Sequence, residues 1–539
     1  MKCALSALVF LSLLPCVLFA DDPVVRVHVR PDIIGVDEGA IQNAGCGTEI
    51  WRGGPHNGET RLVRTAVRVS DYSVNAMIRV NWSDYERREA EYLFARMDKH
   101  FEYCIQYGQK LNIGCFVTSS NHGITIGGGL CAYPAYVHEA LQRSDRKDVK
   151  YTTSRGNITR WEPNFENPYF FERYDALLRA FAKYLDGSQT FERRRIQRKK
   201  LVRYIEMRHF GFWGEGAYPK KLVPSNSECL IRFADAFARH FPDVRLLAPT
   251  NGMVYSPATY DTIKDYHFHL LAARNHVGPF GIFRDNWGWD ENLSYVQKLF
   301  YASNKYEKDG VRLYELLRDR WKLAPVVGEP LQALPKEGFR PYSHLLEQVR
   351  YLHPVVIRNC NVSNGTKSYV NPSGYNAFDD PKAMDNFHKM YAIIGYRYLF
   401  TSATITRRGD KLAIAADWLN IGLTPTYEEW KVRYLIKDDA GEEIWAGTSS
   451  LDLRTLPPDE NTPPGVVNVD RARTHTDRFT NVPKTGRLYL QIVDPVGVSP
   501  PMALSIRART EEGAYLLSAQ SRRKRPAKEV EVTPDHRRS

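Results

Sequence analysis

The most constraining feature of this chain is the regular alternation of strand-like and helix-like segments between residues 70 and 400. Short apolar segments alternate with longer ones of helical periodicity, and this alternation predicts a parallel sheet. The strand-like segments are residues 75–82, 113–118, 204–216 (with a turn at its end), 244–248, 279–285, 324–329 and 354–358. Helices are expected over residues 87–107, 170–185, 228–240, 311–321, 343–352 and 381–394. Between residues 119 and 168 we expect a long glycine-rich loop.

Seven strands are visible, whereas a (β/α)8 barrel needs eight. The missing strand is expected before residue 70, within residues 43–51 or 62–70. Counted from it, the strand ending near Trp82 is the second, the strand before Glu215 is the fourth, and the strand ending on Glu329 is the seventh. The active site of such a barrel lies at the carboxyl ends of its strands, where both glutamates fall.

The pattern changes after about residue 400. Short strand-like segments at residues 411–419, 430–436 and 486–493, with turn signals between them, predict a β-sandwich. The expected fold class is therefore α/β, a (β/α)8 TIM barrel followed by a C-terminal β-sandwich. We assign residues 21–400 to the barrel, 401–517 to the sandwich and 518–539 to a disordered basic tail.

The first twenty residues predict a cleaved secretory signal. Lys2 gives the positive start, residues 4–19 are mostly apolar, and Asp21 and Asp22 follow the small residue Ala20. The apolar stretch is too short for a comfortable membrane span, and no second one follows. We therefore expect a soluble chain, secreted or periplasmic, without an integral membrane segment after signal removal. Six scattered cysteines remain, which leaves both disulfides and buried free thiols open.

The formal net charge of +12 is a mild surplus for 539 residues, of which the tail from residue 520 holds seven Lys/Arg against three Asp/Glu. The surplus suits an anionic polysaccharide or simply solubility. The basic run over residues 193–200 lacks interleaved aromatic residues, so no nucleic-acid partner is expected. His267 and His269 cannot share a helix face and lack a third ligand, so neither a metal nor another cofactor is expected.

Two glutamates stand at predicted strand ends. Gly214 and Gly216 flank Glu215 and let the backbone turn sharply, and Pro330 holds Glu329 extended. Singly, each has a structural explanation, such as complementing a helix dipole. Together, at the fourth and seventh strands, they predict the carboxyl pair of glycosidic bond cleavage. One carboxyl protonates the leaving oxygen, while the other attacks or stabilises the sugar cation.

Aromatic and polar residues near other strand ends are candidates for binding a carbohydrate substrate. Indole rings stack on the apolar faces of sugars, although tryptophan is also common in cores. An inward Arg79 can orient a nucleophilic carboxylate or merely fill the barrel. Asp285 can bind a sugar hydroxyl or cap the following turn. The predicted substrate-binding residues are Arg79, Trp82, Trp213, Asn251, Asp285 and Trp287.

Residues 81–86, Asn-Trp-Ser-Asp-Tyr-Glu, resemble the W-x-x-x-E segment that follows the second strand of barrel glycosidases. The resemblance implies membership of a large clan of retaining (β/α)8 enzymes. These enzymes carry an acid/base glutamate after strand four and a nucleophilic glutamate after strand seven, the positions of Glu215 and Glu329. Much of the clan has asparagine immediately before the acid/base, where this chain has Gly214.

The chain also resembles secreted bacterial proteins of unknown function that combine a glycosidase-like barrel with a C-terminal sandwich. The matching segments are residues 211–215, 284–286, 328–329 and 420–425, and the resemblance covers residues 30–517. This second resemblance indicates the architecture and says little about the substrate. The glutamate pair and the resemblance to the clan imply a retaining glycoside hydrolase acting on a polysaccharide or glycan, with Glu329 as nucleophile and Glu215 as acid/base. A non-catalytic carbohydrate-binding protein on the same scaffold and a polysaccharide lyase remain as alternatives.

Overall fold

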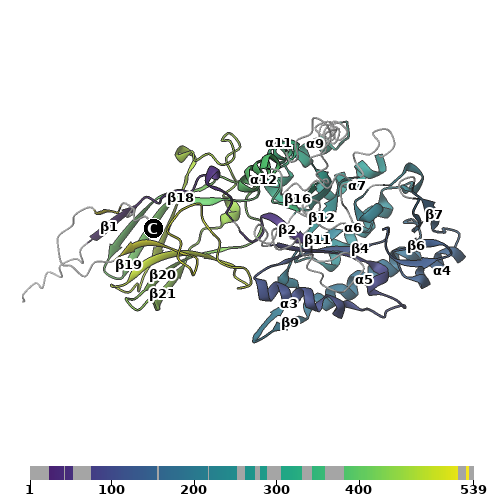
Figure 1. Ribbon diagram of the computed structural model, residues 1–539, viewed down its shortest axis with the longest axis horizontal. Coiled ribbons are helices and arrows are strands. Elements are labelled where there is room, and N and C mark those ends of the chain that lie inside the picture. The colour runs from purple at the N-terminus through teal and green to yellow at the C-terminus, as the bar shows by residue number, and fades with distance from the viewer. Residues whose placement is uncertain are drawn as a thin grey trace, which may run out of the picture.

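The computed structural model describes residues 24–41, 43–51, 75–153, 157–216, 218–251, 261–272, 279–287, 305–330, 343–358, 381–519 and 530–532. It consists of a barrel surrounded by helices and a sandwich of antiparallel sheets, which lie side by side along the long axis (Figure 1). The predicted signal segment and the stretch 62–70 lie outside the described residues.

Eight parallel strands close the barrel in the order β11-β12-β13-β16-β17-β2-β3-β4. They are β2 (Gly47–Trp51), β3 (Asn75–Asn81), β4 (Leu111–Val117), β11 (Val202–Met207), β12 (Arg245–Pro249), β13 (Gly281–Trp287), β16 (Val326–Pro330) and β17 (Val356–Arg358). The predicted (β/α)8 fold class is confirmed, and the missing first strand is β2. In chain order β11 is the fourth barrel strand and β16 is the seventh.

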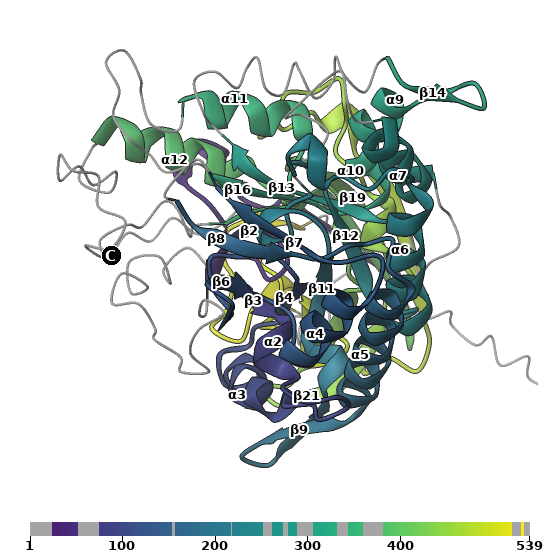
Figure 2. The same cartoon turned by 90° about the vertical axis from the view of Figure 1, so that its right-hand side faces the viewer.

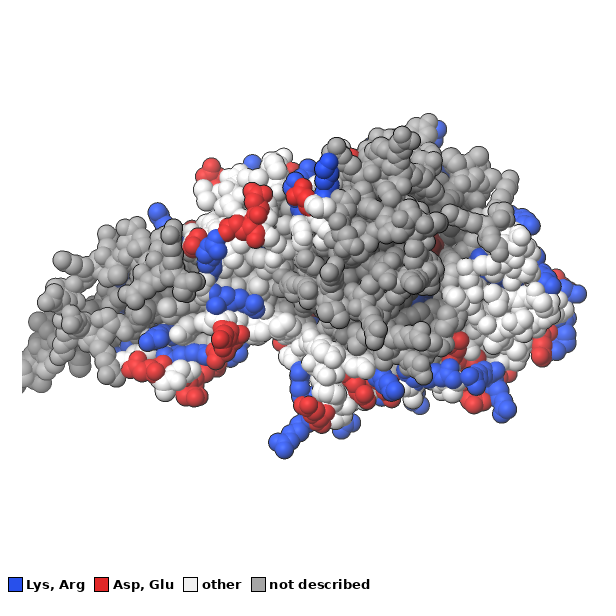
Figure 3. All heavy atoms as spheres, in the orientation of Figure 1, with Lys and Arg blue, Asp and Glu red and all other residues white. Residues whose placement is uncertain are grey.

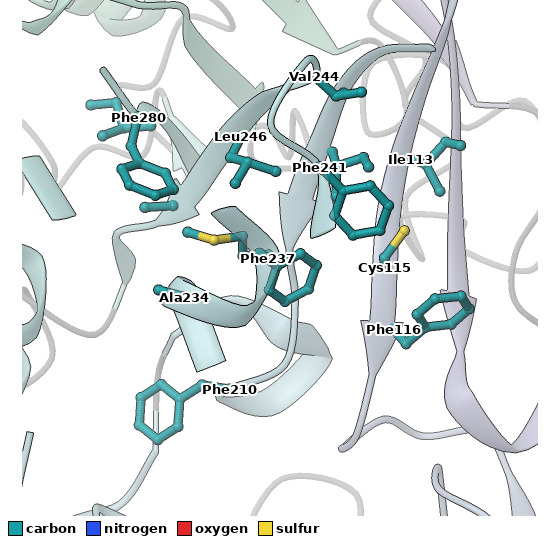
Figure 4. Packing of buried hydrophobic residues seen from close by; sticks show 14 of the residues in the cluster. Ile113, Cys115, Phe116, Phe210, Ala234, Phe237, Phe241, Val244, Leu246 and Phe280 are labelled. Atoms are coloured by element: carbon teal, nitrogen blue, oxygen red, sulfur yellow. The ribbon is translucent and has the colours of Figure 1, made fainter. Parts of the chain in front are cut away.

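Helices cover the outside of the barrel (Figure 2). The main ones are α3 (Asp98–Tyr107), α5 (Pro168–Asp186), α6 (Glu228–His240), α7 (Asp261–Ala272), α9 (Leu313–Arg318), α11 (Ser343–Leu352) and α12 (Pro381–Ile393). On β4, Ile113 and Cys115 point outward, and Phe237 of α6 lies in the same buried cluster with Phe241, the residue that follows α6 (Figure 4). Because side chains alternate along a strand, those on the other face of β4 point into the barrel interior.

The helix expected over residues 87–107 forms only in its second half. The chain first makes one short helix, α2 (Trp82–Tyr85), and reaches the 3-10 turn η2 (Phe94–Met97) directly before α3. Between them Ala90 has a φ of 62°, in the left-handed region that a helix cannot continue through. Its N–H is satisfied by the Glu86 carboxylate, at 2.9 Å, instead of by a helical carbonyl.

A small inserted sheet occupies residues 119–168, where we expected a loop. It contains β5 (Ile124–Ile126), β6 (Gly129–Cys131), β7 (Val149–Thr152) and β8 (Thr159–Glu162), in the order β5-β6-β8-β7, with α4 (Ala135–Arg143) beside it. Seen from the side away from the sandwich, β7 and β8 lie in front of the barrel strands (Figure 2). The inserted sheet therefore borders the end of the barrel opposite the sandwich.

The sandwich consists of one sheet in the order β22-β19-β18-β1-β25 and another in the order β21-β20-β23-β24. Its strands are β1 (Val24–Val29), β18 (Tyr398–Arg408), β19 (Lys411–Asn420), β20 (Lys431–Lys437), β21 (Glu443–Thr448), β22 (Arg473–Phe479), β23 (Arg487–Val493), β24 (Ala514–Ala519) and β25 (Val530–Val532). Two strands differ from the predicted domain boundaries. β1 was assigned to the barrel but pairs with β18 of the sandwich. β25 lies in the tail that was expected to be disordered, and it pairs with β1.

The sandwich is fused to the amino-terminal end of the barrel. Residues inside the barrel share one buried apolar cluster with the sandwich core; they are Tyr204, Leu247, Phe283, Val327 and Val356. An ionic network crosses the same boundary, because Glu428 of the sandwich contacts Arg203 at the start of β11 and Lys110 just before β4, the latter at 2.8 Å. Over the described residues, the sandwich thus meets the barrel at the end opposite the carboxyl ends of its strands.

Replacing Glu428 by Gln should lower the free energy of unfolding by about 3 kcal/mol at pH 7. Burial alone would raise the pKa of Glu428, but Arg203 and Lys110 outweigh it and hold that pKa at about 2. Because the folded-state pKa is depressed, the stabilisation is complete above pH ~4.5 and disappears as pH falls towards 2. Urea unfolding of the native chain and the variant between pH 3 and 7 measures this difference in the free energy of unfolding.

The matched control is Glu429→Gln. The neighbouring Glu429 is half exposed and pairs with Lys431 at the surface. Its loss should change the free energy of unfolding by less than about 0.5 kcal/mol. Equal effects of the two substitutions would show that the buried network does not fasten the sandwich to the barrel.

Five cysteines are buried free thiols: Cys46, Cys104, Cys115, Cys131 and Cys229. Cys360 lies outside the described residues.

No helix in the described ranges has the length and apolar character to cross a bilayer, and the same ranges hold no group of three or more His, Cys, Asp or Glu side chains placed to bind a metal.

The predicted basic run forms part of a hairpin, β9 (Ser188–Phe191) and β10 (Arg194–Gln197), between α5 and β11. Positive and negative side chains are interspersed over the described part of the face in Figure 3. The hairpin contributes exposed arginines at its tip.

Candidate active site

Glu215 lies in the turn that follows β11. The chain enters a single 3-10 turn, η4 (Phe212–Gly214), in which Trp213 has a φ of 58°. A left-handed tryptophan costs about 1–3 kcal/mol and persists only where its surroundings hold it, a condition typical of functional sites. Here the Trp213 N–H donates to the Ser119 carbonyl at 2.7 Å, which anchors the turn to the end of β4.

Gly214 explains the one departure from the glycosidase pattern. It has a φ of 67°, and a Cβ at this position would lie 2.3 Å from the Cβ of Arg208 and 2.4 Å from its carbonyl oxygen. The turn folds back directly onto Arg208, so there is no space for the side chain of an asparagine before Glu215. An amide reaches Glu215 from elsewhere, because Asn251 at the end of β12 donates to its Oε2 at 3.5 Å.

Arg79 lies between the two predicted catalytic carboxylates. Its Nη1 is 3.5 Å from Oε1 of Glu215, and its Nη2 is 3.4 Å from Oε2 of Glu329. Since both contacts are to one planar guanidinium, the nearest carboxylate oxygens lie no more than roughly 9 Å apart. That limit admits both the spacing of about 5 Å in retaining glycosidases and the wider spacing in inverting ones. The structure thus brings together Arg79, Glu215 and Glu329.

Two further arginines surround the pair. Arg208 lies 2.6 Å from Glu206 and 3.8 Å from Glu215, and the absence of a side chain at Gly114 makes room for it. The contact of Arg208 with Glu215 was not predicted from the sequence. The signal available in the sequence was the spacing of Glu206 and Arg208, two residues apart and so on one face of an extended chain.

Arg358 and Glu49 were missed by the sequence analysis. Arg358, at the end of β17, contacts Glu49 at 2.9 Å, Glu329 at 3.4 Å, and also Glu206. Burial raises the pKa of Glu49, while the charge of Arg358 opposes that rise. The barrel interior therefore holds a continuous buried network of three arginines and four glutamates that fixes both candidate catalytic side chains.

Trp213 is the predicted aromatic residue that lies at this site. Its half-buried ring is 5.7 Å from the guanidinium carbon of Arg79 and packs edge-on against His122, with ring centroids 5.2 Å apart. Asp285 and Trp287 belong to β13, but their side chains lie outside what the structure describes.

Trp82 is a correction, because it belongs to the core and not to the substrate site. Its side chain is fully buried, packs against Phe170 and Tyr174, and donates from Nε1 to Glu86 at 2.7 Å. Glu86 also accepts from the Tyr136 hydroxyl at 2.8 Å. A ring without exposed surface offers no face to a sugar, so the W-x-x-x-E segment acts structurally in this chain.

Comparisons with known proteins add a fold-level likeness. No family model matches the chain, and no curated protein matches it significantly. Endo-glycoceramidase II from Rhodococcus sp. is 11% identical with a TM-score of 0.40, over 72% of this chain and 86% of that one. The catalytic domain of beta-amylase from Paenibacillus polymyxa is 10% identical with a TM-score of 0.35, over 65% and 98%.

A third solved structure is the glycoside hydrolase family 30 subfamily 8 xylanase Xyn30A from Clostridium acetobutylicum. It is 11% identical with a TM-score of 0.33, over 83% of this chain and 96% of that one. Such likenesses are too slight to assign an activity or a substrate. The resemblance to secreted bacterial proteins of unknown function stays a prediction.

Proposed function

We propose that this chain is a glycoside hydrolase that cleaves a polysaccharide or glycan by a retaining mechanism. The observation that carries the proposal is the contact of one buried guanidinium, Arg79, with both Glu215 and Glu329 at the carboxyl ends of the barrel strands. Barrel enzymes place their active sites at that end, and glycosidic cleavage needs two carboxyl groups facing one linkage.

The surroundings of the two carboxylates support different roles. Glu329 faces two guanidinium groups, Arg79 and Arg358, each at 3.4 Å, so its side chain is held in one position, as attack on the anomeric carbon requires. Glu215 makes longer ionic contacts, at 3.5 and 3.8 Å, and its side chain keeps 14% of its surface exposed. Looser contacts suit a group that gives up a proton and later takes one from water.

The reaction then proceeds in two displacements. Glu329 bonds to the anomeric carbon while the glycosidic C–O bond breaks and Glu215 gives its proton to the leaving oxygen. In the second step Glu215 takes a proton from water, the water oxygen bonds to the anomeric carbon, and the bond to Glu329 breaks. The free sugar leaves, and both carboxyl groups return to their starting protonation states.

A digest of a glycan library, read by mass spectrometry and ultraviolet absorbance, tests the class of reaction. Hydrolysis adds one water for each linkage that is cleaved, shared between the two products, and neither product absorbs. Unsaturated, absorbing products would instead identify a lyase, and binding without any product would identify a carbohydrate-binding protein. The double variant Glu215→Gln/Glu329→Gln is the control, and its digest should leave the library unchanged.

A further inference from the structure

We propose that Glu162 is a positioning residue that holds the turn carrying Glu215 and so links the inserted sheet to the active site. The inference rests on the proposed function for its effect on turnover. The positioning itself is a property of the folded chain and is measurable without a substrate.

Glu162 ends β8 and is almost completely buried, at 2% exposure. Its two carboxylate oxygens serve different partners. Oε1 accepts from the Ser119 hydroxyl at 2.9 Å, and Oε2 accepts from the Tyr218 hydroxyl at 2.7 Å. Ser119 in turn accepts the Trp213 N–H, whereas Tyr218 follows Glu215 by three residues. One carboxylate thus restrains the Glu215 turn on both of its sides.

The protonation state of Glu162 decides whether it can hold both hydroxyls. An ionised carboxylate accepts at both oxygens, but a protonated one has an O–H on one of them. Burial raises the pKa of Glu162 to about 7, although the hydrogen bonds from Tyr218 and Ser119 and the charge of Arg160 oppose the rise. Glu162 therefore changes charge near neutral pH.

The other titratable groups that face Glu162 keep one charge state over this range. Cys131 ends the neighbouring strand β6 and Tyr133 follows it, and burial raises the pKa of both side chains well above neutral pH. Burial also raises the pKa of Tyr218. Arg160 remains a cation, although burial lowers its pKa. Two imidazoles also lie nearby, because His122 packs against Trp213 and His138 pairs with Asp148, so the transition of Glu162 is identified as the one that Glu162→Gln removes.

The expected behaviour follows from these contacts. Above pH 7 the ionised Glu162 holds both hydroxyls, and the strained backbone at Trp213 stays in place. Below pH 7 one hydrogen bond to a charged group is lost, and amide exchange in residues 210–218 should rise at least about tenfold after correction for intrinsic rates. Turnover should fall over the same interval, through kcat more than KM, because the turn carries the proposed acid/base.

Hydrogen–deuterium exchange of the full chain, native and with Glu162→Gln, tests the inference. The amide mimics the protonated acid, so the variant at pH 8 should exchange like the native chain at pH 6 and show no transition. Carbon-13 NMR of labelled glutamate carboxyls should show a group that titrates near pH 7 in the native chain and is missing in the Glu162→Gln variant. Glu139→Gln, an exposed position of α4, is the matched control and should behave like the native chain.

Tyr218→Phe keeps the test decisive if Glu162→Gln does not fold, since it removes one of the two hydrogen bonds and leaves the carboxylate. It should raise exchange in residues 210–218 at pH 8. Unchanged protection in both variants, or in whichever one folds, would overturn the inference. The glycan digest judges the proposed function separately, because exchange and NMR need no hydrolysis.

Discussion

Replacing Glu329 by Gln should lower kcat/KM at least about 10³-fold on any substrate that the native chain cleaves. The amide is nearly the same size and can still accept from Arg79 and Arg358, so the arrangement of the site should survive. It cannot form the covalent bond to the anomeric carbon that the first displacement requires. Steady-state kinetics on substrates found in the glycan digest measure the effect, with KM expected to change much less than kcat.

Glu49→Gln is the matched control for this experiment. Glu49 is buried in the same network and contacts Arg358 at 2.9 Å, yet it has no contact with Arg79 in the described structure. If loss of any carboxylate charge from the network were responsible, the two variants would lose similar activity. We expect the Glu49 variant to lose less than about tenfold. Turnover by Glu329→Gln at the native rate would remove Glu329 from the nucleophile role.

Much of the barrel was predictable because its signals are local. The helix from residue 228 to 240 was expected with the bounds that α6 has, since its apolar face repeats with helical periodicity. The fourth and seventh strands were placed by counting, and this count depended on a further strand before residue 70, which is β2. The positions of Glu215 and Glu329 followed from it.

The errors arose where structure depends on contacts distant in sequence or on very short elements. β1 pairs with β18, about 380 residues away, and nothing in its own sequence distinguishes the two domains. The strands of the inserted sheet have three or four residues, too few for a period to show. Trp82 sits at a strand end, as a sugar platform would, but only α5 decides that it is buried.

In the charged network around the site, too, some contacts were predictable from the sequence and others were not. Arg79, Glu215 and Glu329 were expected to meet because the fold places strand ends together. The partnership of Arg358 with Glu49 required knowing that the last strand closes onto the first, which joins residues 309 positions apart. Closure of the barrel therefore brings the separate charged residues into one network, and no single segment of the sequence predicts this network.

Replacing Glu215 by Ala should lower turnover of natural glycosides about 10²- to 10⁴-fold, because their leaving oxygens need a proton. Aryl glycosides with acidic phenols leave without that proton, so their first displacement should proceed and the covalent intermediate should accumulate. A burst of phenol followed by slow turnover is the expected time course. Asn251→Ala, which removes the 3.5 Å amide contact to Glu215 but keeps the carboxylate, is the control and should retain protonation of poor leaving groups.

Azide added to Glu215→Ala decides the stereochemical course, which the contacts with Arg79 leave open. The missing side chain frees space beside the intermediate, and azide needs no general base to attack. In a retaining enzyme two inversions occur, so the glycosyl azide should carry the anomeric configuration of the substrate, and azide should raise turnover of the aryl glycoside. Proton NMR of the isolated product reads the configuration. A glycosyl azide of opposite configuration would mean a single displacement, and Glu329 would then be the base that activates water instead of the nucleophile.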